Sequence, residues 1–205
     1  MPIFTIFNHE GESERLINCI EIDLLHNMQA GEKYILGEYQ NHYLVNNQPV
    51  EKPPRPSDFH NWDTAQKAWF ADLDGAKAAM WRKIQDERTR RMAGGYPVVF
   101  NGQTWWLHSD TASLSQQQGL VQMAQLVAMQ KGDMNQTLTQ WKTMGGSFVN
   151  MTPNFALAMF QAGMAQQQAI FTAAEKHKAM MSASAEPWQY DYSTDWPKIY
   201  EETKE

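Results

Sequence analysis

The stretch from Lys77 to Ala183 decides the fold, and near its start it reads Met80-Trp81-Arg82-Lys83-Ile84-Gln85-Asp86-Glu87-Arg88-Thr89-Arg90-Arg91, followed by Gly94-Gly95-Tyr96. Residues 74–91 are rich in alanine, with apolar side chains at facing positions, and they predict a helix. Gly94-Gly95 supplies its C-terminal stop. Asn101-Gly102 then lies between two apolar runs, 96–100 and 104–107, and this pair favours the type I′ turn of a β-hairpin.

The second half of this stretch repeats the alternation of helix and hairpin. Ser109 or Asp110 is expected to cap a helix that continues to Gly132. A second hairpin is predicted over residues 138–151, and Thr152-Pro153 indicates the start of a final helix of about 30 residues. Its apolar side chains predict partial burial against the other two helices, with oligomerisation as the alternative.

The first fifty residues predict a small, mostly antiparallel β module. Four short strands are expected, at residues 2–7, 16–22, 33–39 and 42–45, with the last closing a hairpin at Val50. The segment Glu-Lys-Pro-Pro-Arg-Pro-Ser-Asp at residues 51–58 favours an extended, semi-rigid linker, because proline cannot join a helix or a central strand.

Aromatic residues gather at two places outside the expected helices and hairpins. One group follows the linker and the other lies in an aromatic and acidic C-terminal segment; the candidate partner-binding residues are Phe59, Trp62 and Trp69, and Trp188, Tyr190, Tyr192 and Trp196. The first group could form a strand or docking strip, or pack on the following helix. The second is expected to lie as a peptide-like arm on its own domain or on a partner.

Together these segments predict an α+β fold in four parts. They are a β module at 1–50, a linker with its aromatic segment at 51–76, the helix–hairpin–helix–hairpin–long helix module at 77–183, and the arm at 184–205.

Composition excludes several classes of protein. Hydrophobic residues form 42% of the 205, enough for a core, and the net charge of −6 argues against nucleic-acid binding. Asp86 and Glu87 lie among the basic residues of 82–91, and charge pairs at three- and four-residue spacing are typical of a solvated helix face. The single cysteine, Cys19, excludes an intrachain disulfide and is expected to be a buried thiol. No signal peptide or membrane-spanning stretch is found, so synthesis in a cytoplasm without membrane insertion is expected.

No catalytic, cofactor-binding or metal-ligating residues are predicted. The six histidines are scattered, and His9-Glu10 lacks the second histidine of a helical zinc-protease motif. Asp72 and Asp74 are better explained by a helix start than by a shared cation. Gly94-Gly95 lacks the other parts of a phosphate-binding loop.

The order of these parts resembles that of a known family. Residues 46–57, Asn-Asn-Gln-Pro-Val-Glu-Lys-Pro-Pro-Arg-Pro-Ser, are similar to the turn and Pro-rich linker of phage tail proteins encoded beside tail fibres. The phrases Trp62-Asp63, Trp81-Arg82-Lys83-Ile84 and Glu87-Arg88, with the later Trp141 and Thr152, resemble a domain of unknown function common in those proteins. The likeness covers residues 40–183. The chain departs at Gly145-Gly146, where the family has an Asp-containing turn.

The resemblance implies a non-enzymatic bacteriophage tail protein, part of the virion and associated with host attachment. Such a protein would act as a structural adaptor of the tail tip or tail fibre that binds neighbouring tail proteins, with a homo-oligomer left open. An assembly chaperone of the tail fibre is the first alternative, and a glycan or cell-wall hydrolase is the second.

Overall fold

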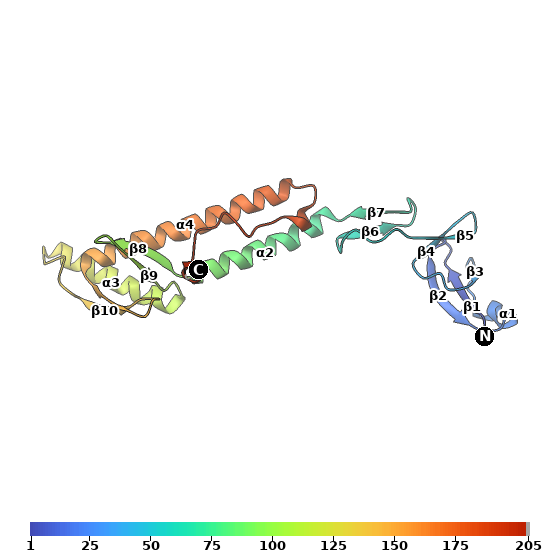
Figure 1. Cartoon of the computed structure of the whole chain (residues 1–205), viewed down its shortest axis with the longest axis horizontal. Coiled ribbons are helices and arrows are strands. Elements are labelled where there is room, and N and C mark those ends of the chain that lie inside the picture. The colour runs from blue at the N-terminus through green and yellow to red at the C-terminus, as the bar shows by residue number, and fades with distance from the viewer. Residues whose placement is uncertain (204–205) are drawn as a thin grey trace. The chain divides into compact units, whose positions relative to one another are not determined.

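The chain divides after Leu73 into two units, each with its own core. The computed structural model describes residues 1–203, and its units are Met1–Leu73 and the segment that begins at Asp74. Short antiparallel strand pairs form the first unit, and helices with two hairpins form most of the second (Figure 1). The predicted α+β class is confirmed.

A three-stranded antiparallel sheet is the centre of the first unit. Its order is β2 (Ser13–Asn18), β1 (Ile3–Phe7), β3 (Lys33–Leu36), so β1 pairs on both sides. One face of β1 covers a small core, to which α1 (Glu21–Leu24) and a 3₁₀ turn (Leu25–Asn27) add side chains. The buried members of this core are Phe4, Ile6, Cys19 and Leu24. The burial of the Cys19 thiol is therefore confirmed.

The predicted strand at 16–22 is wrong beyond Asn18. Residues Glu21–Leu24 form a helical turn instead, which buries Leu24 and leaves Ile20 and Ile22 exposed. The apolar alternation resembled a strand, but Glu21 and Asp23 lie in the first turn, where acidic side chains favour a helix start. Strand β3 ends earlier than expected because Gly37 takes a positive φ of 121°.

Two hairpins complete the first unit. The pair β4 (His42–Val45) and β5 (Gln48–Glu51) turns at Asn46-Asn47, both with positive φ, as expected from the sequence. Residues 52–57 are extended without regular structure. They lead into the pair β6 (His60–Asp63) and β7 (Ala68–Ala71), so the aromatic segment is a hairpin of this unit.

The second unit has the predicted order of helices and hairpins. In chain order its elements are α2 (Leu73–Ala93), β8 (Tyr96–Phe100), β9 (Gln103–Leu107), α3 (Thr111–Met129), β10 (Thr139–Lys142), β11 (Phe148–Met151) and α4 (Pro153–Ala183). Two helix starts have the expected caps: the Asp110 carboxylate accepts from the Ser113 amide, and the Thr152 hydroxyl accepts from the Phe155 amide.

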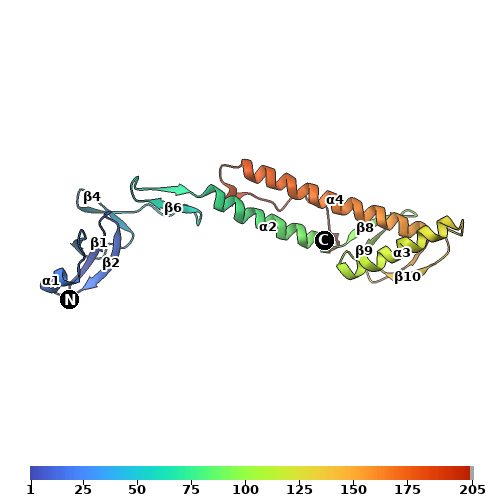
Figure 2. The same ribbon diagram turned by 180° about the vertical axis from the view of Figure 1, so that it is seen from behind.

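The main core of the second unit lies between α3, the first half of α4 and the two hairpins (Figure 2). Phe155 and Met159 of α4 are fully buried against Val98 and Leu107 of the first hairpin. Tyr96 is buried too, and its hydroxyl donates to Gln117 Oε1 of α3 at 2.6 Å. Burial raises the pKa of the Tyr96 phenol, so it remains a neutral donor.

The second half of α4 lies alongside α2, away from this core. Residues 184–203 then turn back as an extended arm that runs along both helices, with 3₁₀ turns η2 (Pro187–Gln189) and η3 (Tyr200–Thr203) (Figures 1 and 2). A separate cluster joins Met80 and Ile84 of α2 to Ala174 and Met181 of α4, and arm side chains pack against it.

Two glycines provide a matched test of the backbone geometry. At the tip of the first hairpin Gly102 has φ of +76°, so Gly102→Ala should destabilise the protein by about 1 kcal/mol. Gly119 lies inside α3 with open space around its Cα, so Gly119→Ala should stabilise by about 1 kcal/mol. Urea unfolding followed by circular dichroism measures the change in the free energy of unfolding for each substitution. Changes of the same sign in the two variants would contradict the backbone geometry described for these glycines.

Candidate interaction surfaces

The β6–β7 hairpin is anchored to the first unit through a buried carboxylate. Glu12 is 7% exposed, and its Oε1 accepts from Trp62 Nε1 at 3.0 Å and from Lys67 Nζ at 2.7 Å. Its Oε2 lies 2.6 Å from Lys52 Nζ. Burial alone would raise the pKa of Glu12, but the hydrogen bonds from Lys52, Lys67 and Trp62 outweigh it, so the pKa lies below its usual range.

Aromatic rings continue from this carboxylate along the hairpin. The Trp62 ring lies 5.4 Å from that of Tyr43 and 5.3 Å from that of Trp69, between centroids. Trp69 Nε1 donates to the Pro53 carbonyl at 2.8 Å, and the Lys52 ammonium lies 4.8 Å from the Trp62 ring centroid. These contacts explain why the Pro-rich segment and the hairpin pack together.

The predicted partner-binding residues of this segment therefore have contacts inside their own unit. Phe59, Trp62 and Trp69 are all half-buried. Their neighbour Phe70 is the exposed aromatic of the hairpin, at 51%. A role of these residues in binding a partner stays a prediction, and Phe70 is the ring that a partner could reach without rearrangement.

The Glu12 cluster predicts a pH-dependent stability of the first unit. A carboxyl whose folded pKa is lowered contributes stability above its unfolded pKa of about 4.3, and this stability is lost as pH falls through the folded pKa. Glu12→Gln should cost about 2 kcal/mol at neutral pH and should weaken the acid dependence. Urea unfolding at pH 7 and pH 3, followed by NMR signals of β1, measures this.

Glu14 provides the control, because its side chain is about half exposed. Glu14→Gln should leave the stability at both pH values close to that of the unchanged chain. An equal effect of the two substitutions would show that the buried carboxylate has no special role.

The C-terminal arm binds α4 through His177, which is buried. Its Nδ1 lies 2.9 Å from the Tyr190 hydroxyl and its Nε2 lies 2.9 Å from the Thr194 carbonyl oxygen. The Trp196 ring stacks on the imidazole with centroids 4.9 Å apart, and Trp196 Nε1 donates to the Tyr192 carbonyl at 2.7 Å. The sequence left open whether the arm lies on its own domain or on a partner, and in the structure it lies on its own domain.

All four aromatic residues predicted for the arm are half-buried. Tyr190, Tyr192 and Trp196 pack against the cluster between α2 and α4, whereas Trp188 lies in the 3₁₀ turn η2 that follows the buried Pro187. The arm thus completes the packing of two helices. Whether it also contacts another protein stays a prediction.

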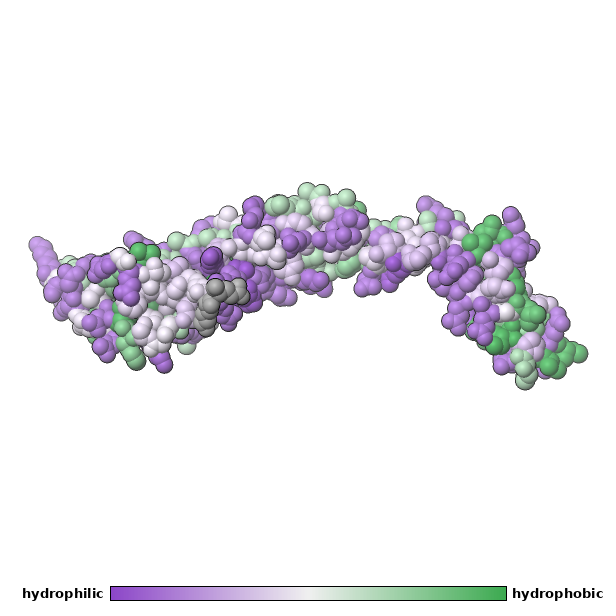
Figure 3. Space-filling view, viewed as in Figure 1, coloured by the Kyte–Doolittle hydropathy of each residue, from purple (hydrophilic) through white to green (hydrophobic). Residues whose placement is uncertain are grey.

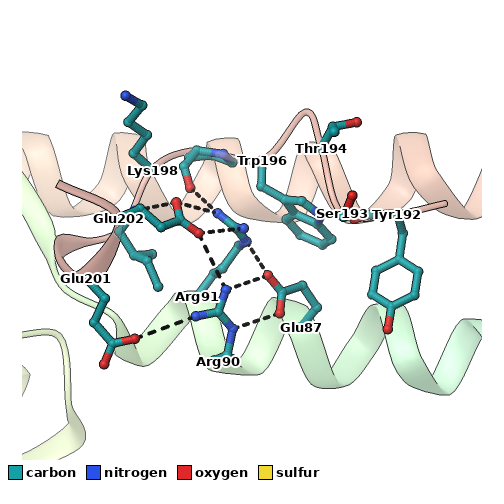
Figure 4. A network of polar contacts seen from close by, with 12 residues as sticks. Glu87, Arg90, Arg91, Tyr192, Ser193, Thr194, Trp196, Lys198, Glu201 and Glu202 are labelled. Carbon is teal, nitrogen blue, oxygen red and sulfur yellow. Dashed lines mark hydrogen bonds and ion pairs between the residues drawn. The ribbon is translucent and has the colours of Figure 1, made fainter. Parts of the chain in front are cut away.

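Arg91 joins the arm to α2 (Figure 4). It is 5% exposed, and its guanidinium donates to Glu87 Oε1 at 2.6 Å, to the Pro197 carbonyl at 2.8 Å and to Glu202 Oε1 at 2.9 Å. The Trp196 ring centroid lies 5.4 Å from the guanidinium carbon. We call Glu87, Arg91, Pro197 and Glu202 the Arg91 cluster. In this cluster the buried guanidinium is paired with two carboxylates, and a buried arginine is stable only when its charge is paired in this way.

The expectation of a solvated basic face on α2 is wrong for Arg91. Met80, Ile84, Glu87 and Arg91 recur at spacings of four, three and four, which is one face of a helix. This face packs toward α4 and the arm, so Arg91 occupies a buried position. Arg90, one position earlier, is 47% exposed at its side chain and pairs with Glu87 from outside. The hydrogen bonds from Arg90, followed by those from Arg91, hold the Glu87 pKa below its usual range.

The last residues of the arm pack closely against Gly94, in the turn between α2 and β8. A Cβ built on Gly94 would lie 2.8 Å from the Cβ of Ile199, which is fully buried. The Tyr200 amide donates to the Gly94 carbonyl at 3.0 Å. Gly94 was expected only as a helix stop; its lack of a side chain also admits the arm.

Substitutions of Arg91 and of its neighbour Arg90 test whether the buried guanidinium holds the arm in place. Arg91→Met should cost about 3 kcal/mol of stability, because it leaves Glu87, Glu202 and the Pro197 carbonyl without their shared donor. Arg90→Met should cost under about 1 kcal/mol. Thermal unfolding by circular dichroism measures the loss.

Limited proteolysis adds a local measurement to this pair. Arg91→Met should speed cleavage within residues 184–203, as seen by intact-mass spectrometry, and Arg90→Met should not. Equal cleavage rates in the two variants would show that Arg91 does not hold the arm.

Another surface of the second unit is formed by helix segments without charged residues. Helix α3 contains no Asp, Glu, Lys or Arg, and α4 contains none before Glu175, whereas α2 carries both signs along its length. We call the following exposed or half-buried residues the neutral face: Gln118, Gln122, Gln125 and Met129 of α3, and Phe160, Met164, Gln167 and Phe171 of α4.

A small apolar pocket of about 120 Å³ opens between the two helices of the neutral face. Tyr96, Leu114, Val121 and Met159 line it, and Phe160, Met164 and the amides of Gln118 and Gln167 surround them. A cavity of roughly 150 Å³ admits benzene, so this pocket suits one apolar side chain.

The first unit also exposes apolar side chains. They lie on α1 and on the edge strand β3, and the most exposed are Ile20, Ile22, Leu25 and Leu36. Apolar surface gathers over this unit in the view of Figure 3. Patches of this kind often mark contacts with other proteins.

The described part of the chain brings no metal-ligand set together. Within residues 1–203 no group of three or more His, Cys, Asp and Glu side chains could hold a metal ion. Asp74 lies in the first turn of α2, which agrees with a helix start. Over the same residues, no helix combines the length and the apolar character needed to cross a membrane.

The second unit carries the match to a known family. A family model described as "Domain of unknown function (DUF4376)" matches residues 75–194, more than half of the 205 residues, and the chain belongs to this family. The match ends at Thr194, so Trp196, Pro197, Ile199 and Glu202 lie beyond it. No curated protein and no solved structure matches the chain.

Proposed function

We propose that this chain is a non-enzymatic structural adaptor of a bacteriophage tail, where it binds neighbouring tail proteins at the tail tip or tail fibre. The likeness of residues 40–183 to phage tail proteins supports the phage context. The observation that carries the adaptor role is the pair of separate units, each with a core of its own and apolar side chains left exposed. An adaptor needs two such surfaces, one for each neighbour.

The two surfaces differ in chemistry, which suits two different neighbours. The first unit exposes aliphatic side chains beside an edge strand, where an added strand or an apolar ridge can pack. The second unit exposes methionine, phenylalanine and glutamine on α3 and on the part of α4 before Glu175, neither of which carries a charged residue. Depletion of charge is typical of the centre of protein interfaces.

Cross-linking mass spectrometry of purified phage particles tests the adaptor role. We expect the chain in the particles, with Lys33 of the first unit and Lys131 and Lys142 of the second cross-linked to different tail proteins. Absence from particles, with binding to fibre protein before assembly, would favour the assembly chaperone instead. Cross-links from one unit alone would contradict an adaptor.

A further inference from the structure

We propose that the groove between α2 and α4 in which the C-terminal arm lies is a peptide-binding site, and that it also binds the arm of a second copy of this chain. In such an exchanged pair, the arm of each copy occupies the groove of the other. This inference does not depend on the phage context or on the adaptor role.

The helices hold the arm by its backbone. Three side chains of α2 and α4 each lie within hydrogen-bond distance of a carbonyl oxygen of the arm. These pairs, at 2.8 to 2.9 Å, are Arg91 with Pro197, His177 with Thr194, and Gln166 with Lys198. Contacts to main-chain groups are the means by which proteins bind extended peptides of another molecule.

Three side chains of the arm add specificity to this backbone recognition. The Trp196 ring centroid lies 5.4 Å from the Arg91 guanidinium carbon. Ile199 is 1% exposed and packs against Gly94, and Glu202 accepts from Arg91 at 2.9 Å. These contacts define the ligand of the groove as an extended peptide with the sequence Trp-x-x-Ile-x-x-Glu.

Opposite charges line the groove and its occupant. Lys176 of α4 pairs with Asp195 at 2.9 Å, and Arg90 of α2 lies 3.9 Å from Glu201 and 3.6 Å from Glu202. Exposed pairs of this kind contribute more to specificity than to affinity. The groove therefore selects an acidic and aromatic segment, and the arm of a second copy is such a segment.

The family match separates the groove from its occupant. The groove residues Arg91, Gly94 and His177 lie within the matched residues 75–194, whereas residues 196–202 lie beyond them. The family domain thus carries a site for a segment that is appended to it. A tethered segment can reach this site from its own copy or from another.

Residues 184–186 form the hinge that exchange requires. Helix α4 ends at Ala183, the first buried residue of the arm is Pro187, and Ala185 and Glu186 between them are exposed. At the hinge the chain turns back along the helices (Figure 1). In the exchanged pair the hinge is straight, and the two α4 ends meet at a two-fold axis. Both forms contain the same contacts between arm and groove, so protein concentration shifts the balance between them.

A mixture of two full-length variants tests the exchange. Trp196→Ala weakens the arm and keeps the groove, whereas Gly94→Ala keeps the arm and places a Cβ 2.8 Å from the Cβ of Ile199, which obstructs the groove. We expect the mixture to form a 1:1 dimer of about 47 kDa in sedimentation equilibrium, twice the 23.6 kDa of one chain. Each variant alone should remain a monomer. A monomeric mixture, or a dimer of either variant alone, would overturn the proposal.

Circular dichroism shows whether the two variants keep the helicity of the unchanged chain. Ile199→Ala is the second arm variant, to be used where Trp196→Ala lowers the helicity, because it removes a different contact with the groove.

A labelled synthetic peptide of residues 186–203 measures binding at the groove directly. By fluorescence anisotropy it should bind the Trp196→Ala chain at least about 10-fold more tightly than the unchanged chain, in which the native arm competes. Binding that is equally tight to both chains, or no binding to an arm variant of normal helicity, would contradict the site.

Two altered peptides provide the matched control. Glu202→Gln in the peptide should weaken binding by about 10-fold, because it removes the charged partner of a buried guanidinium. Glu201→Gln should leave binding unchanged, since this side chain is 78% exposed. An equal effect of the two changes would show that the peptide does not bind as the arm does.

Discussion

The second unit depends on a buried guanidinium that is shared between a helix and the end of the chain. Arg91 donates to a carboxylate one turn earlier on α2 and to a carbonyl and a carboxylate of the arm. Removing a charged group from water is costly unless its donors are satisfied, so the arm has to be in place for Arg91 to be buried. The apolar cluster between α2 and α4 depends on the same arm, because tyrosine and tryptophan rings of the arm pack against it.

In both units, aromatic segments outside the main helices and sheet pack against other parts of the same unit. In the first unit a tryptophan indole and two lysines converge on Glu12, and in the second an indole stacks between His177 and Arg91. In each case an aromatic ring shields an ionic or polar group from water, which strengthens the interaction. Most of the exposed apolar side chains left for other molecules lie on α1, β3, α3 and α4, and Phe70 is the exposed ring of the aromatic hairpin.

Local signals in the sequence predicted the elements that local chemistry determines. Asn101-Gly102, Asp110 and Thr152-Pro153 fix a turn and two helix starts through groups a few residues apart. The burial of Arg91 could not be predicted in this way, because its partners in the arm are 106 and 111 positions away. Met80, Ile84, Glu87 and Arg91 lie at the spacing of one helix face, but the charge of Arg91 favoured a solvated interpretation. The apolar alternation at Ile20 and Ile22 predicted a strand, but in the structure these residues belong to a helical turn.

The distance along the chain between Arg91 and its partners also orders events during synthesis. A ribosome delivers the N-terminal residues first, and domains generally fold as they emerge. The core between α3, α4 and the hairpins is complete in sequence once Met159 has emerged, but α2 gains its last partners only with Pro197, Ile199 and Glu202. Helix α2 therefore reaches its final packing at the end of translation, and a nascent chain stalled before Pro197 would leave Arg91 without its arm partners.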